Sequence, residues 1–206
     1  MKSRIQNLNI PFLNFKHKEM LNKPFTPEEV KIAAFQIRPF KAPGIDGKPG
    51  MFYQKYWNII GNLTTASTLS CLNSGCILKE LNKTLITLIP KMDCPRNVSQ
   101  YRPISLCNVA YKIIVKIIVN RLQPIMGDLI SPYQTAFIKG RSISNNIIVS
   151  SEVMSTIGKR KSRRGFLEAL KLDMDKAYDR ISWNFIKVVM DCMGFNCHWI
   201  KSFVFC

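Results

Sequence analysis

Acidic side chains are scarce in this chain. Thirteen Asp and Glu stand against 30 Lys and Arg in 206 residues, so the formal net charge is +17 at pH 7. A balance this basic predicts an anionic partner, either a nucleic acid or an acidic membrane surface. The sequence also lacks internal repeats and low-complexity tracts, which excludes collagen-like, coiled-coil and disordered chains. Because 47% of the residues are hydrophobic, a substantial core can be buried.

Long apolar runs are missing too. The longest apolar-looking run, residues 104–119, contains Asn108, Lys112 and Lys116, and is therefore too short and too charged to span a bilayer. The N-terminal segment MKSRIQNLNI has no apolar stretch of signal-peptide length. We expect a soluble, intracellular protein of the nucleus or the cytoplasm, with no membrane partner and no sign of a protein partner.

The cysteines do not form a recognisable metal site. There are seven of them, an odd number that is typical of reduced thiols in an intracellular chain. The one metal-like grouping is Cys192, Cys197, His198 and Cys206, and its spacing fits none of the usual zinc patterns. We expect these side chains to fill apolar space.

The periodicity predicts an α+β chain that is mostly helical with a few short strands. Thr26-Pro27-Glu28-Glu29 is a capping box with proline at the first helical position, so a helix begins there and ends before Pro39. The tight loop KAPGIDG follows at residues 41–47. The other predicted helices are one around residues 51–60, then 62–72 ended by Gly75, 109–122, 143–157, and a long last helix with Ala177, Ile181, Phe185, Val188 and Cys192 on its face. The predicted strands are 84–89 and 101–106, which form a hairpin-like pair, and a central strand at 166–172.

Two predicted connections join the later elements. Residues 131–142 read as a loop with one aromatic anchor, Phe137. The run KRKSRR at residues 159–164 is either a contact to nucleic-acid phosphates, a solvated turn or a nuclear-import-like run.

Four of the few acids fall within one short stretch: Glu168, Asp173, Asp175 and Asp179. If residues 166–172 form a strand, Asp173 and Asp175 share a face at its end. A strand end is a rigid mount for carboxylates, and one or two carboxylates with substrate phosphates are a common way to hold Mg²⁺. The alternative is a helix start decorated with acids, in which Asp175 caps the helix and Asp179 pairs with a neighbouring cation.

The segments LIPKMDCPRNVSQYRPISLCNVAYKIIVKIIVNRL, SPYQTAFIKGRSISNNI and ALKLDMDKAYDRISW occur in this order along the chain. Together they resemble the reverse transcriptase of non-LTR (LINE-type) retrotransposons, with the plant elements most similar. The upstream KAPGIDG and LNKTLITLIPK also resemble the lead into that domain. The resemblance implies a partial right-hand polymerase fold: an N-terminal extension at 1–75, fingers at about 76–165 and the start of the palm at about 166–206.

The resemblance also implies roles for particular residues. Asp173 matches the first catalytic aspartate, which binds both Mg²⁺ ions together with the carbonyl of Met174. Tyr178 matches the aromatic gate that selects deoxyribose, while Arg102 and, with a less certain alignment, Lys91 match the cations that hold the triphosphate. The residues that match the QxxFxxGR segment at the fingers–palm junction and template path are Gln134, Phe137, Gly140 and Arg141.

The implied function is RNA-directed DNA polymerisation, in which deoxynucleoside triphosphates are added to a DNA primer on an RNA template. The family's later carboxylate pair has no counterpart, because no Asp-Asp pair occurs in the sequence. We therefore expect an incomplete two-ion site and no polymerisation by this chain alone. Three alternatives remain: an inactive nucleic-acid-binding remnant of a truncated element, a helical interaction protein whose acids cap a helix, and a group II intron-type maturase.

Overall fold

The computed structural model describes residues 10–159, 168–174 and 180–205. The described residues form two compact units. One contains the residues up to His17 together with Gln123–Phe195, and the other contains Lys18–Leu122 together with the residues from Asn196 onward.

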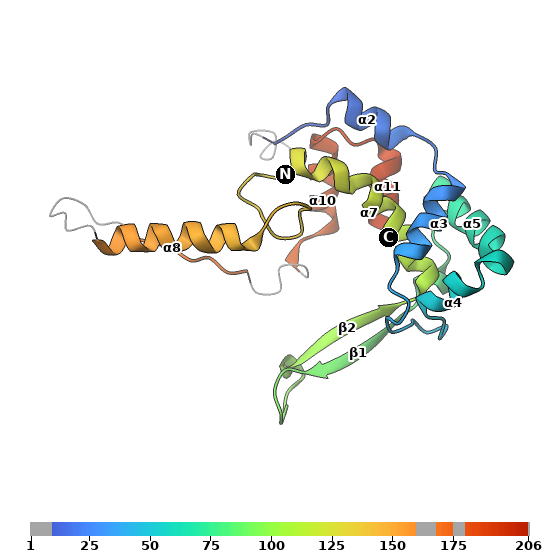
Figure 1. The fold of residues 1–206 in the computed structure, drawn as a ribbon, viewed down its shortest axis with the longest axis horizontal. Coiled ribbons are helices and arrows are strands. Elements are labelled where there is room, and N and C mark those ends of the chain that lie inside the picture. The colour runs from blue at the N-terminus through green and yellow to red at the C-terminus, as the bar shows by residue number, and fades with distance from the viewer. Residues whose placement is uncertain (1–9, 160–167, 175–179, 206) are drawn as a thin grey trace. The chain divides into compact units, whose positions relative to one another are not determined.

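The described elements are mainly helices (Figure 1). In chain order they are α2 (Phe15–Asn22), α3 (Pro27–Gln36), α4 (Gly50–Lys55), α5 (Trp57–Ser74), α6 (Lys79–Asn82), β1 (Thr84–Pro90), the 3₁₀ turn η1 (Val98–Gln100), β2 (Tyr101–Cys107), α7 (Val109–Leu129), α8 (Ile143–Lys159), α10 (Trp183–Cys192) and α11 (Cys197–Phe205). The predicted α+β class, mostly helical with short strands, is confirmed.

Helix α3 begins with the predicted capping box. The Thr26 hydroxyl accepts the Glu29 N–H at 3.3 Å, and the Glu29 carboxylate accepts the Thr26 N–H at 2.8 Å. Two N–H groups that the helix itself cannot satisfy are thereby paired. Helix α3 then packs against α4 and α5.

The helices after the KAPGIDG loop divide differently from the prediction. The break lies at Tyr56 rather than near residue 61, and α5 continues through Gly61. Gly61 is buried against the Trp57 ring, and a Cβ there would lie 2.9 Å from Trp57 Cε2. This glycine therefore serves close packing inside a helix. Gly75 ends α5 with φ 67°, as predicted.

Helix α7 carries the main apolar stripe of the second unit. The predicted residues Val109, Ile113, Ile114, Ile117 and Ile118 are all at most 3% exposed. Burying five such side chains at helical spacing stabilises this unit.

The predicted end of this helix at residue 122 is wrong, because α7 continues through Pro124 to Leu129. Proline lacks the N–H of the helical ladder, which normally ends or kinks a helix. Beyond it, Ile125 and Leu129 are buried at 2% and 3% exposure. We attribute the continuation to this apolar burial.

Arg121 on α7 ties the segment before α3 to the helix. Its guanidinium forms two 2.7 Å bonds to the Glu29 carboxylate and donates to the carbonyls of Leu21, Lys23 and Pro24. The guanidinium carbon also lies 3.9 Å from the centre of the Phe25 ring. A cation that is only 8% exposed therefore has its donors paired, as burial of a charge requires.

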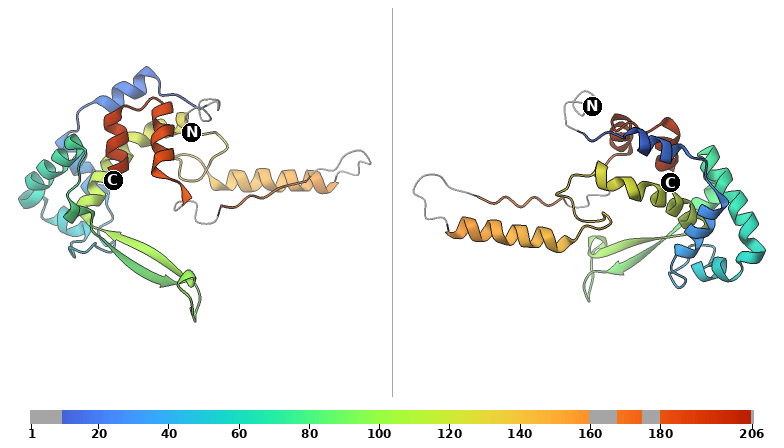
Figure 2. Two further views of the ribbon diagram at one scale, coloured as in Figure 1. Left: turned by 180° about the vertical axis from the view of Figure 1, so that it is seen from behind. Right: turned by 45° about the horizontal axis from the view of Figure 1, so that its top comes forward.

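The two predicted strands form an antiparallel hairpin. The register runs from Thr84 opposite Cys107 to Pro90 opposite Tyr101. Every residue of β1 is exposed. The hairpin is drawn as a two-stranded ribbon in Figure 1, and the same pairing is visible in both views of Figure 2.

The predicted central strand at 166–172 is not formed in the part of it that the structure describes. Residues 168–174 have no regular structure and are all exposed. A strand needs a neighbour for its N–H and C=O groups, and within the described residues β1 and β2 pair with each other.

The predicted last helix is not continuous, because Arg180 is helical but Ile181 and Ser182 interrupt the helix before α10. Helix α10 starts at Trp183, and the Ser182 hydroxyl accepts the Phe185 N–H as its N-cap. Ile181 and Ser182 are therefore outside the helix. Ala177 lies outside the described residues.

Candidate nucleotide and nucleic-acid site

Asp173 and Met174 lie on the exposed segment 168–174, which belongs to the first unit. The Met174 side chain is 61% exposed. Asp175, Tyr178, Asp179 and the basic run at 160–164 lie outside the described residues. The structure therefore places both residues predicted to bind metal, Asp173 and Met174, on an exposed segment.

A divalent ion needs more ligands than this segment supplies. Among the residues that the structure describes, no group of three His, Cys, Asp or Glu side chains could hold a metal ion. Mg²⁺ usually completes its shell with water and substrate phosphates around one or two carboxylates. The described residues by themselves thus fit only part of a divalent-ion site.

The predicted triphosphate cations lie together on the hairpin, in the second unit. Arg102 on β2 is exposed and stands opposite Ile89 on β1. Lys91 follows β1 directly, and its N–H donates to the Gln100 carbonyl at 2.8 Å across the end of the hairpin. Lys91 and Arg102 therefore both lie near the turn end of the hairpin.

Lys91 is already engaged in this conformation. Its ammonium donates to the Ser99 carbonyl at 2.8 Å. The turn between the strands is further held by Gln100, whose side-chain oxygen accepts the N–H groups of Arg96 and Asn97. The hairpin end that carries the two cations is thus shaped by its own hydrogen bonds.

Arg141 holds the loop 131–142 to the end of α7. Its guanidinium donates to the carbonyls of Ser131 at 2.5 Å, Gln134 at 2.6 Å, Gly127 at 2.9 Å and Ile130 at 3.1 Å. These include orphan carbonyls at the C-terminus of a helix, where a cation also meets the negative end of the dipole. The structure therefore brings Gln134 and Arg141 together through the backbone.

Phe137 is not the anchor that the sequence predicts. Its side chain is 92% exposed, and its backbone has φ 66°, a conformation that is uncommon for a residue with a Cβ. Gly140 adopts φ 81° in the same loop. The loop is held by Arg141 and by Asn146, which donates to the Tyr133 carbonyl and the Thr135 hydroxyl.

Sequence reasoning missed the residue that fixes the KAPGIDG loop. Asn108 is 3% exposed; it accepts the Asp46 N–H at 3.3 Å and donates to the carbonyls of Glu80 and Leu81. The loop approaches so closely that a Cβ on Gly44 would lie 2.3 Å from Asn108 Oδ1. The sequence does contain a signal for this role, because the polar Asn108 stands between the predicted strand 101–106 and the apolar stripe of the predicted helix 109–122.

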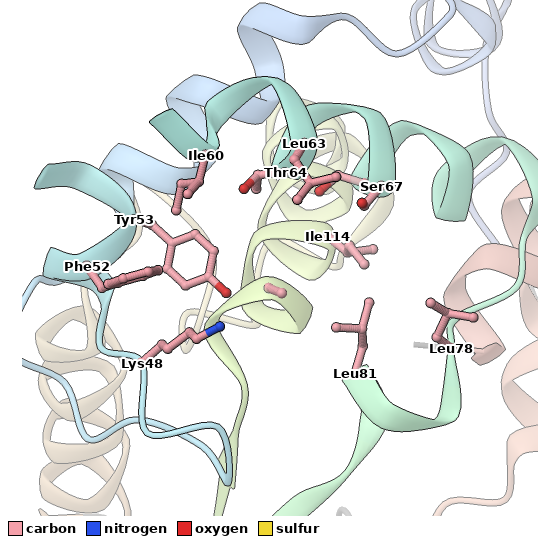
Figure 3. Close-up of a pocket in the computed structure, with 12 residues that line it drawn as sticks. Lys48, Phe52, Tyr53, Ile60, Leu63, Thr64, Ser67, Leu78, Leu81 and Ile114 are labelled. Carbon is pink, nitrogen blue, oxygen red and sulfur yellow. The ribbon is translucent and has the colours of Figure 1, made fainter. Parts of the chain in front are cut away.

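The second unit also contains a largely apolar pocket of about 280 Å³ (Figure 3). Its lining includes Phe52, Ile60, Leu81 and Ile114, and the Tyr53 hydroxyl and Lys48 amine lie at one end. Burial, and then the negative charge of Asp46, raise the pKa of Tyr53 above its usual value. None of the predicted site residues lines this pocket.

Across the described parts of the chain, every helix is too short or too polar to cross a membrane.

Comparison with known proteins identifies the class to which these features belong. The family described as reverse transcriptase (RNA-dependent DNA polymerase) matches residues 89–206, which is more than half of the chain. The chain therefore belongs to the reverse transcriptase family. The match includes Arg102, the QxxFxxGR loop and Asp173.

Three relatives are proteins of transposable elements. The chain is 26% identical over 187 residues to the transposon TX1 uncharacterized 149 kDa protein of Xenopus laevis, covering 91% of the chain and 14% of that protein. It is 27% identical over 179 residues to a retrovirus-related Pol polyprotein from the type-1 retrotransposable element R1 of Bradysia coprophila, with coverages of 78% and 16%. A Pol polyprotein from element R2 of Popillia japonica is 28% identical over 175 residues, with coverages of 84% and 23%.

These relatives confirm the predicted resemblance to the reverse transcriptase of LINE-type retrotransposons. They favour a retrotransposon over the group II intron alternative. The chain spans less than a quarter of the length of each relative.

Proposed function

We propose that this chain forms the fingers and the opening of the palm of an RNA-directed DNA polymerase encoded by a retrotransposon. The single observation that carries this proposal is the family match at 89–206, which spans the ordered motifs around Arg102, Gln134 and Asp173. A net charge of +17 supports it, since the RNA template and DNA primer are polyanions. Residues 1–75 would lead into the polymerase, in a soluble intracellular protein.

The triphosphate of the incoming deoxynucleotide is the proposed ligand of Arg102 and Lys91. Their position near the same end of an exposed hairpin supports this role. Guanidinium binds phosphate oxygens in a fork, and ammonium binds them as a point charge. In the free chain Lys91 must exchange its bond to Ser99 for one to phosphate.

The other proposed roles follow the motif positions. Asp173 and the carbonyl of Met174 would be ligands of Mg²⁺, with Tyr178 as the gate beside the sugar. Gln134, Phe137, Gly140 and Arg141 would shape the fingers–palm junction and the template path, and the four bonds from Arg141 to backbone carbonyls support a shaping role.

Photo-crosslinking of radiolabelled dTTP in the presence of primer–template tests the triphosphate site on this chain directly. Arg102→Gln and Lys91→Gln should each reduce crosslinking severalfold, because each removes a phosphate contact. The control Lys79→Gln removes an exposed lysine elsewhere and should leave the signal unchanged. Equal signals in all four proteins would rule out the proposed grip.

Primer extension on poly(A) with oligo(dT) tests the chemistry. A polypeptide that joins this segment to an acidic hairpin of the family should extend the primer, and Asp173→Asn should abolish the extension. Asp173 makes no hydrogen bond or ion pair with another described residue, so this variant should fold normally. Undiminished extension by Asp173→Asn would refute the catalytic assignment.

A second candidate is nucleic-acid binding without polymerisation. The exposed position of Asp173 on a segment without regular structure favours it, because a solvated carboxylate on such a segment holds a divalent ion weakly. Salt-sensitive binding of primer–template with no extension by any polypeptide that carries the segment would identify this function.

A further inference from the structure

A groove of about 410 Å³ lies between the segment after α3 and the outer face of α7, within the second unit. It is lined by Gln36, Ile37, Arg38, Lys41, Tyr111, Lys112, Val115, Lys116 and Val119. Four of these nine residues are cations and none is an acid. We call it the basic groove.

The geometry of α7 explains why cations gather there. The face with Ile113 and Ile117 is buried, so the neighbouring positions Lys112 and Lys116 point away from that core. They are four residues apart and so lie about 6 Å apart along the helix. The two lysines therefore form a row along one wall of the groove.

Hydrogen bonds fix the opposite wall to the helix. The Lys112 ammonium donates to the Ala42 carbonyl at 3.2 Å, and Asn120 donates to the Gln36 side chain at 3.0 Å. The Lys41 N–H donates to the Arg38 carbonyl at 3.3 Å, which closes the turn that carries both cations. The groove is thus a feature of one folded unit.

The charges in the groove are not neutralised by the described part of the chain. Arg38, Lys41 and Lys116 make no ion pair with another described residue, whereas Arg121 on the same helix is paired with Glu29. Like charges four residues apart on a helix destabilise it slightly. A bound polyanion would remove this repulsion and gain a contact at each cation.

We propose that the basic groove binds the phosphates of a single-stranded nucleic acid. Arg38 offers a fork for phosphate oxygens and the lysines offer point charges. Tyr111 lines the same groove and offers an aromatic surface on which a base can stack, as in other single-strand-binding grooves. Two of the cations, Arg38 and Lys41, precede the family match at 89–206, so the groove extends nucleic-acid contact beyond that region. The proposal rests on the proposed function for its choice of ligand, but it does not require polymerisation.

Fluorescence anisotropy with a labelled oligouridylate, without divalent ions or nucleotides, tests this surface. The variant Arg38→Gln/Lys41→Gln removes two exposed cations, and the control Lys31→Gln/Lys79→Gln removes two exposed cations outside the groove. The plot of log K against log salt has a negative slope. Its magnitude should decrease by about 1.4 in the groove variant, because two phosphate contacts are lost and each contributes about 0.7 on a single strand. It should stay unchanged in the control.

A second variant distinguishes lost phosphate contacts from a local folding defect in the loop that carries Arg38 and Lys41. Lys116→Gln changes the α7 wall alone and should lower the same slope by about 0.7. If the groove and control variants lost the same amount of salt slope, the proposal would be overturned, because binding would then depend on net charge alone. Displacement of the RNA by polyglutamate as readily as by unlabelled RNA would overturn it too, because the groove would then be a site for acidic polypeptides. If the primer-extension experiment shows no extension but the salt slopes change as expected, the proposed function is contradicted and the proposal for the groove is supported.

Discussion

At the residue scale, one arginine connects three stretches of the second unit. Arg121 is contributed by α7, its partner Glu29 by α3, and its carbonyl acceptors by the segment around Lys23. Glu29 also completes the capping box of α3. Losing either charge would therefore affect both a helix terminus and the attachment of the N-terminal segment.

Arg121→Met should lower the free energy of unfolding by about 3 kcal/mol, the lower part of the range for breaking a buried ion pair. The lower value applies because the Glu29 side chain is 31% exposed and is partly screened by water. Urea denaturation would measure the loss. The control Lys116→Met on the same helix should change stability by less than about 0.5 kcal/mol.

The stability of the protein should fall in acid partly through Glu29. Burial opposes its charged form, but bonds from Arg121 and Thr26 outweigh this, and its pKa lies below the usual 4.5. A carboxyl with a lowered pKa stabilises the fold above pH 4.5, and this stabilisation is lost as pH falls through its folded pKa. Thermal melts should thus show that the difference in melting temperature between the protein and Glu29→Gln becomes smaller below pH 4.5. A difference that stays constant down to pH 3 would contradict this account.

Gly44→Ala should destabilise the protein by about 1–3 kcal/mol, the usual cost of overpacking. The new Cβ would lie 2.6 Å from the Cys107 carbonyl carbon, a backbone atom that cannot turn aside. Gly127→Ala is the matched control. Nothing lies within 4 Å of a Cβ there, and alanine should stabilise α7 by up to about 1 kcal/mol. Equal melting temperatures for the two variants would contradict the close approach.

At the element scale, the β1–β2 hairpin exposes apolar side chains. Leu85, Ile86, Leu88, Ile89 and Ile104 are all between 41% and 63% exposed. A two-stranded hairpin with this surface has unpaired outer edges, and such edges promote association with other chains.

Ile86→Thr/Leu88→Thr should reduce self-association without unfolding the protein. Both side chains are exposed on one face of β1, and threonine keeps the strand propensity. Light scattering at rising concentration would measure association. The free energy of unfolding, measured by thermal melts, should change by less than about 0.5 kcal/mol. Ile113→Thr, at a fully buried position, should instead unfold the protein at lower temperature. Unchanged scattering in the hairpin variant would assign association to another surface.

At the scale of the whole molecule, charge dominates the expected behaviour. The net charge of +17 predicts that primer–template affinity falls steeply with salt, by about 0.9 in log–log slope for each duplex phosphate contacted. Filter binding over a salt series would measure the slope. Affinity that does not respond to salt would exclude phosphate contacts as the main source of binding.

Local patterns in the sequence determined much of the fold. The capping box at Thr26, the α7 stripe, the hairpin and the helix end at Gly75 were predicted and are confirmed. Each depends on residues close together in the chain or on a periodicity that one helix displays by itself. The family was also evident from the sequence, because its motifs occur in a fixed order.

Only the tertiary structure decided which distant residues meet. Arg121 is 92 residues from Glu29, and Asn108 is 62 residues from Asp46. The basic groove likewise joins Arg38 and Lys41 to lysines on α7. No local periodicity encodes such pairings, because they follow from how the buried face of α7 packs. Local sequence also could not show that residues 168–174 are exposed and irregular. A strand forms only where a neighbouring strand supplies its hydrogen bonds, and that depends on the tertiary structure.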